Sequence, residues 1–71
     1  MVDLRTCKPG DKLISKHGME LIYMRPLPEG TYMDHEVKYP DGSLGTRTHD
    51  GFVFRKKRLD ADHDIVEIVP Q

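Results

Sequence analysis

The sequence predicts a small all-β domain, an antiparallel meander of five to six strands that forms either a small barrel or a curved open sheet. Three observations lead to this prediction. The chain has only 71 residues, which fits a single domain. Six glycines divide it into short runs rich in β-branched and aromatic residues. Apart from a weak candidate at residues 60–69, no stretch shows the longer 3.6-residue apolar period of a helix.

The first two strands are expected at residues 11–16 and 19–25, joined as a hairpin. The His17-Gly18 dipeptide between them predicts a two-residue loop, because glycine adopts positive φ without steric cost. Such a loop pairs Leu13 with Ile22. One face then carries Ile14, Met19, Leu21 and Tyr23, and the other carries Leu13, Ile22 and Met24. Both faces are apolar, so this hairpin is expected to need cover on both sides.

The later strands are predicted from the turn signals that separate them. Residues 26–30, PLPEG, form a loop, because proline cannot donate to a strand ladder. Two Asp-Gly pairs, at 41–42 and 50–51, are strong hairpin signals, and they bracket a short strand at residues 43–49. The strands expected after the loop cover residues 31–39, 43–49, 52–55 and 64–69. Between the last two, residues 56–63 predict a loop with one turn of 3₁₀ structure.

The register at Pro40-Asp41-Gly42 has two solutions. A two-residue turn pairs Tyr39 with Leu44, whereas a type I turn followed by a glycine bulge shifts the pairing by one residue. A slip of one residue exchanges the two faces of a strand. It therefore decides whether Phe52 and Phe54 belong to the core or to the surface.

Composition limits the range of partners and compartments. The net charge is −1, so no overall field attracts nucleic acid or an anionic membrane. Cys7 is the single cysteine, which excludes an internal disulfide. There is neither a signal-like apolar run at the start nor a stretch of membrane-spanning length. We therefore expect a cytoplasmic protein with one domain over residues 1–71, in which residues 1–9 are loosely ordered.

The sequence resembles known proteins in two ways. The opening Lys8-Pro-Gly-Asp-Lys-Leu-Ile-Ser15 resembles the Pro-Gly-Asp entry into the first strand of SH3-like barrels, including the KOW type. With its Asp-Gly turns and its late Asp64-Ile65-Val66, the chain as a whole resembles small uncharacterised β-rich proteins of phages and prophages. The first resemblance implies an SH3-like barrel, and the second implies no activity and no functional residue.

Apolar surface gives the leading functional hypothesis, a non-catalytic binding module. Methionines are common on adaptable contact surfaces, and the two-sided first hairpin leaves apolar side chains uncovered. The module would act by contact with another protein or by self-association. The candidate contact residues are Leu13, Ile22, Met24, Leu27 and Met33.

A basic and aromatic stretch at residues 47–58 supports the alternative hypothesis, weak nucleic-acid binding. Cations meet phosphates and bases stack on rings in such sites. The acidic residues at 60–67 follow directly and offset the positive charge. The candidate residues are Arg47, Phe52, Phe54, Arg55, Lys56, Lys57 and Arg58.

No catalytic residue, cofactor or metal site is predicted. Strand pairing brings His35 close to His49, but two imidazoles are too few for a metal site. Asp60, Asp62 and Asp64 resemble the start of a calcium loop, yet Ile65 and Gln71 occupy the positions that need glycine and glutamate. No sequence feature places a histidine beside Cys7 as a nucleophile pair.

Overall fold

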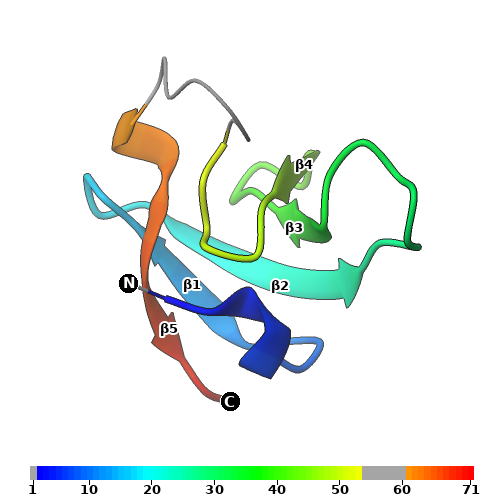
Figure 1. Ribbon diagram of the computed structural model, residues 1–71. Coiled ribbons are helices and arrows are strands. Elements are labelled where there is room, and N and C mark those ends of the chain that lie inside the picture. Colours follow the sequence, from blue (N-terminus) through cyan, green and yellow to red (C-terminus); the bar gives the residue numbers. More distant parts are fainter. Residues whose placement is uncertain (1, 54–60) are drawn as a thin grey trace.

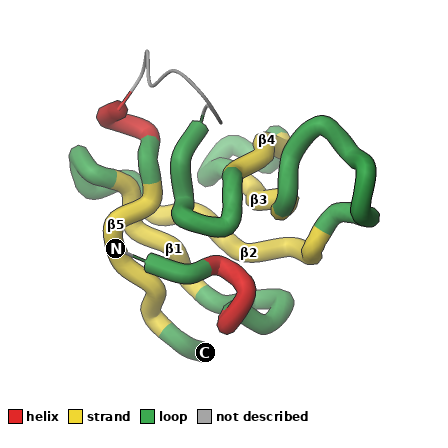
Figure 2. Tube along the Cα trace, viewed as in Figure 1, coloured by secondary structure: helices red, strands yellow, loops and turns green. Residues whose placement is uncertain are grey.

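The computed structural model describes residues 2–53 and 61–71, which form one antiparallel five-stranded sheet in the order β4-β3-β2-β1-β5 (Figure 1). Two turns of 3₁₀ helix accompany the strands, η1 at Leu4–Thr6 and η2 at Ala61–His63 (Figure 2). The strands are β1 Lys12–Ser15, β2 Glu20–Pro26, β3 His35–Lys38, β4 Leu44–Arg47 and β5 Ile65–Val69. The predicted all-β meander is confirmed. The sheet is open, with β4 and β5 at its edges, and is not closed into a barrel.

Three chain reversals share one construction, a type I turn followed by a glycine at positive φ. At the β1–β2 turn, Gly18 donates its N–H to the Ser15 carbonyl and Ser15 donates to the Met19 carbonyl, both at 2.9 Å. Residues 39–43 and 48–52 repeat this pattern. The glycine φ angles are 95°, 91° and 86° at Gly18, Gly42 and Gly51. Each loop is thus the three-residue type with a glycine bulge.

The three-residue loop corrects the predicted register of the first hairpin. Leu13 pairs with Leu21, so the predicted pairing with Ile22 is wrong. Leu13 and Leu21 consequently point to the same face, and both are fully buried. The added loop residue shifts one strand by one position, which exchanges the faces of that strand.

The second half of the chain shows the same effect. Lys38 pairs with Leu44, which is the glycine-bulge solution at Pro40-Asp41-Gly42. Thr48 donates its N–H to the Phe52 carbonyl, as the three-residue loop requires. Phe52 and Val53 have no strand assignment, and the rest of the predicted strand 52–55 lies outside the described residues. The predicted closing strand and 3₁₀ turn are confirmed as β5 and η2.

One face of the sheet carries the core. The N-terminal turn η1 and the segment 48–53 lie on this same face (Figure 1), where Leu4 donates its N–H to the His49 carbonyl at 2.7 Å. Leu4 is fully buried, so part of the segment expected to be loosely ordered packs against the sheet. The core cluster consists of Leu4, Leu13, Leu21, Tyr23, Val37 and Ile65. The opposite face of the sheet, called here the outer face, therefore presents the alternate residues of each strand.

Candidate functional site

A row of five cross-strand neighbours, one from each strand, runs over the outer face. Lys12 pairs with Ile22 on β2 and with Val69 on β5. Lys38 pairs with Ile22 on β2 and with Leu44 on β4. The resulting outer row reads Leu44, Lys38, Ile22, Lys12 and Val69, in which apolar and lysine side chains alternate. Leu44 is 59% exposed, and Ile22 and Val69 are each 37% exposed.

A second row lies beside the outer row, two residues further along three of the strands. Ile14 pairs with Glu20 on β2 and with Glu67 on β5. This acidic row therefore places a half-buried isoleucine between two exposed carboxylates. Lys12 of the outer row lies 3.5 Å from the Glu20 carboxylate across the two rows. The outer face thus presents apolar side chains among charged side chains of both signs.

The predicted contact residues fall into three places. Ile22 is on the outer face, beside the half-buried Met24 at the bulge of β2. Leu13 is in the core and cannot line an exposed surface, because no part of it is exposed. Leu27 and the buried Met33 line a pocket of about 460 Å³ together with Pro28, Glu29, Gly30, Thr31, Asp34 and His49.

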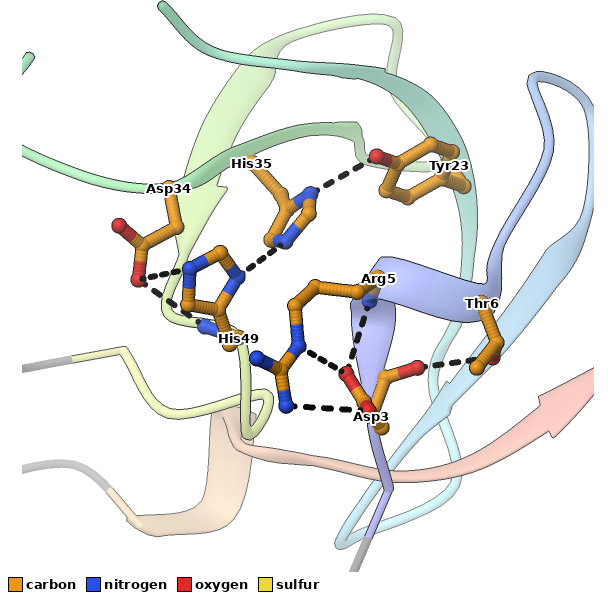
Figure 3. Close-up of polar contacts among 7 residues, drawn as sticks. All are labelled: Asp3, Arg5, Thr6, Tyr23, Asp34, His35 and His49. Carbon is orange, nitrogen blue, oxygen red and sulfur yellow. Dashed lines mark hydrogen bonds and ion pairs between the residues drawn. The ribbon is translucent and has the colours of Figure 1, made fainter. Parts of the chain in front are cut away.

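A chain of polar side chains leads from the core to that pocket (Figure 3). The Tyr23 hydroxyl lies 2.7 Å from His35 Nδ1, and His35 Nε2 lies 2.9 Å from His49 Nδ1. Asp34 Oδ2 accepts the His49 backbone N–H at 3.1 Å and lies 3.8 Å from His49 Nε2. The β3–β4 pairing builds this chain, because it places residues 34 and 35 opposite residues 47–49.

One arrangement of protons satisfies the whole polar chain when both imidazoles are neutral. Tyr23 donates to His35, His35 donates to His49, and the Nε2–H of His49 faces the Asp34 carboxylate. Burial, followed by the neighbouring His49, lowers the pKa of His35 below its ordinary value. Burial also raises the pKa of the Tyr23 hydroxyl. Both shifts favour the neutral forms that this arrangement requires.

The groups around the polar chain form hydrogen bonds of their own or stay protonated. The Asp3 carboxylate accepts from the Arg5 guanidinium at 2.9 Å, and hydrogen bonds from Arg5 lower the pKa of Asp3. The Thr6 hydroxyl donates to the Asp3 carbonyl at 2.8 Å. Burial raises the pKa of the Cys7 thiol to about 11, which leaves it protonated at neutral pH. The arrangement can hold and orient protons, but none of these groups is an activated nucleophile.

The structure describes two of the seven nucleic-acid candidates, Arg47 and Phe52. Arg47 is only 1% exposed, and its guanidinium donates to the His63 carbonyl at 3.0 Å and to the Tyr39 hydroxyl at 2.9 Å. Phe52 is half-buried. Phe54, Arg55, Lys56, Lys57 and Arg58 lie outside the described residues. The guanidinium of Arg47 therefore contributes to the fold and is turned away from solvent.

In the part of the chain that the structure describes, no three side chains among histidine, cysteine, aspartate and glutamate converge as the ligands of a metal ion. Residues 2–53 and 61–71 also contain no helix with the length and apolar character needed to cross a membrane.

Sequence reasoning anticipated one contact of the polar chain and missed the others. The expected proximity of His35 and His49 is confirmed by their 2.9 Å hydrogen bond. Tyr23 was placed on the same face as Leu21, but its hydroxyl was not linked to His35. The outer row was missed because it depends on four registers at once. Two of them are set by the β1–β2 and β3–β4 turns, and the β2–β3 and β1–β5 registers join strands that no tight turn connects.

Comparison of the chain with protein-family models, with curated proteins and with solved structures found no match. The function of this β-sheet domain is therefore inferred from its own residues and their geometry.

Proposed function

We propose that the chain is a non-catalytic binding module that acts by protein contact through the outer face of its sheet. The observation that carries this proposal is the outer row, which crosses all five strands and presents three exposed apolar side chains. Exposed apolar side chains set among charged residues can supply the apolar contacts and the polar rim of a protein interface.

The chemistry of the outer row suits a contact that forms and dissociates. Lys12 and Lys38 keep the apolar side chains of Leu44, Ile22 and Val69 apart, which limits non-specific aggregation. Lysine stems can also cover apolar surface while the ammonium groups reach the rim of an interface. A partner would bury the apolar side chains and meet the charges around them.

The polar chain supports a structural role better than a catalytic one. It links Tyr23, His35 and His49 through hydrogen bonds of 2.7 and 2.9 Å, which hold the 27–34 loop and the 48–52 turn to the sheet. General-base catalysis would need a nucleophile or a bound water within reach of His49. The Cys7 thiol has a raised pKa of about 11, and the Thr6 hydroxyl donates to the Asp3 carbonyl.

Site-specific photo-cross-linking tests the proposal. A photoreactive residue replaces Ile22 or Leu44 on the outer face, or Tyr32 as a control that is 81% exposed and lies outside the strands. Irradiation in the producing cells is expected to give discrete adducts from positions 22 and 44 that excess unmodified protein suppresses. The same adducts from position 32, or no adduct from positions 22 and 44, would contradict the proposed function.

A further inference from the structure

We infer that the outer face binds the outer face of a second copy of this chain, in a two-fold symmetric stack of sheets. This inference rests on the proposed function and names the partner. It follows from the relation between the outer row and the acidic row, which differ in charge and lie side by side on the same three strands.

The two rows are self-complementary under a simple rotation. Lys12 and Ile14 are two residues apart on β1, which separates the rows by about 7 Å. A two-fold axis that lies between the stacked sheets, parallel to the rows and midway between them, places each row over the other row of the partner. Every strand then lies over its own copy. Such an isologous contact is the commonest type in homodimers.

The lysine in the middle of this contact finds two carboxylates. Lys12 comes to lie over the partner's Ile14, which is flanked by the partner's Glu20 and the partner's Glu67. Neighbouring strands are about 4.8 Å apart, so both carboxylates are within reach of one ammonium group. The lysine stem packs on isoleucine and its charge is met on both sides. By symmetry, the same contact occurs twice.

The apolar side chains complement each other in the same arrangement. Ile14 comes to lie over the stem of the partner's Lys12, between the partner's Ile22 and the partner's Val69. Two apolar side chains and a lysine stem thus gather around each isoleucine, and their apolar surfaces lose contact with water. Sheets that stack in this way pack about 10 Å apart at a small angle, so the central strands make most of the contact.

The balance of charges on the outer face favours a second copy of this chain over a partner whose surface carries charges of only one sign. Lys12 and Lys38 lie in the outer row, and Glu20 and Glu67 lie in the acidic row, two charges against two. A strongly acidic or strongly basic partner would be repelled by one of the rows. A surface that carries both signs in the same arrangement meets Lys12 and the two carboxylates together, and this chain carries that surface.

Two charge-reversal variants of the full chain test the inference by sedimentation velocity over a concentration series. Lys12→Glu makes the contact acidic on both sides, and Glu20→Lys with Glu67→Lys makes it basic on both sides. Each variant alone is expected to self-associate at least about tenfold more weakly than the wild type, as like charges face each other. An equimolar mixture of the two variants is expected to restore the dimer, because both symmetric contacts again join opposite charges.

Matched controls change the same charges elsewhere. Lys8→Glu, and Glu29→Lys with Asp62→Lys, reverse exposed residues outside the strands. Each control is expected to dimerise like the wild type. A wild type that stays monomeric, or variants that dimerise as well alone as in the mixture, would overturn the second copy as partner. The cross-links from positions 22 and 44 separate the two proposals, because adducts with a different protein would support the contact function and reject the homodimer.

Discussion

The imidazoles of His35 and His49 form a direct hydrogen bond, with His35 Nε2 2.9 Å from His49 Nδ1 and the rings at 71° to each other. One nitrogen donates and the other accepts, so this bond cannot exist when both rings are protonated. Tyr23 and Asp34 lie at the two ends of the polar chain. A proton added to either ring therefore changes which of the neighbouring groups can donate and which can accept a hydrogen bond.

Stability is expected to fall as the pH drops below the ordinary histidine pKa of about 6.5. Folding lowers the pKa of His35, so near this pH the unfolded chain binds more protons than the folded chain. The free energy of unfolding therefore decreases from about pH 6.5 down to the folded pKa of His35, and is insensitive to this group at higher pH. Urea unfolding at a series of pH values measures this dependence.

The control for the pH experiment is a variant that lacks the His35 imidazole. His35→Gln is expected to reduce the slope below about pH 6.5. Asp11, whose pKa is lowered by backbone N–H groups of Lys8 and Gln71, contributes only near and below about pH 4. Equal slopes in the wild type and His35→Gln would refute the assignment.

Tyr23→Phe is expected to destabilise the fold by about 1–2 kcal/mol, because it leaves the buried Nδ1 of His35 without its hydrogen-bond partner. The ring stays in the core, so the loss isolates the hydroxyl group. Tyr32→Phe removes the same atom from a residue that is 81% exposed and should change the stability by less than about 0.5 kcal/mol. Chemical denaturation of both variants gives the comparison. A similar loss in both would show that the polar chain contributes nothing specific.

Gly51→Ala is expected to cost more than Gly30→Ala, although both glycines have positive φ, 86° and 88°. At either position, alanine is expected to lower the free energy of unfolding by about 1 kcal/mol, because positive φ is unfavourable for a residue with a Cβ. A Cβ at Gly51 would also come within 2.9 Å of the Ile65 carbonyl oxygen and of Val2 Cγ2, whereas a Cβ at Gly30 meets nothing within 4 Å. We expect roughly 1–3 kcal/mol of further loss from this crowding. Thermal unfolding of the two variants measures it, and equal costs would contradict the close packing of the 48–52 turn against β5.

Arg47→Lys is expected to destabilise the fold by about 2–3 kcal/mol, because an ammonium cannot replace the fork that reaches three oxygen atoms. The guanidinium donates to the carbonyls of His63 and Thr46 and to the Tyr39 hydroxyl, and it ties β4 to the segment before β5. Arg25→Lys alters an exposed arginine that pairs with Glu36 at 3.2 Å, and should cost less than about 0.5 kcal/mol. If Arg47→Lys is as stable as the wild type, these hydrogen bonds contribute little to the stability of the fold and the prediction is wrong.

The positions of the strands could be predicted from the sequence because the turns are marked by glycine. His17-Gly18 and Asp41-Gly42 mark true reversals, and the apolar runs beside them become β1, β2, β3 and β4. The register could not be predicted in the same way. A two-residue loop and a three-residue loop with a glycine bulge have nearly the same sequence, and they differ by one residue in every pair that follows.

That ambiguity accounts for the misplacement of Leu13. Leu13 was assigned to the exposed side of the first hairpin because the shorter loop opposed it to Ile22, and the longer loop turns it into the core. The burial of Arg47 could not be predicted from the sequence, for a different reason. Its acceptors include the His63 carbonyl and the Tyr39 hydroxyl, which are brought together only by long-range folding.

The pairing of β1 with β5 also sets the order in which the chain can assemble. Lys12 pairs with Ile22 over a short hairpin, but it pairs with Val69 from the far end of the chain. Closing so long a segment costs more conformational entropy and is slow compared with hairpin formation. The β1–β2 and β3–β4 ribbons are thus expected to gain protection from hydrogen exchange early in refolding, and the amides of β5 last.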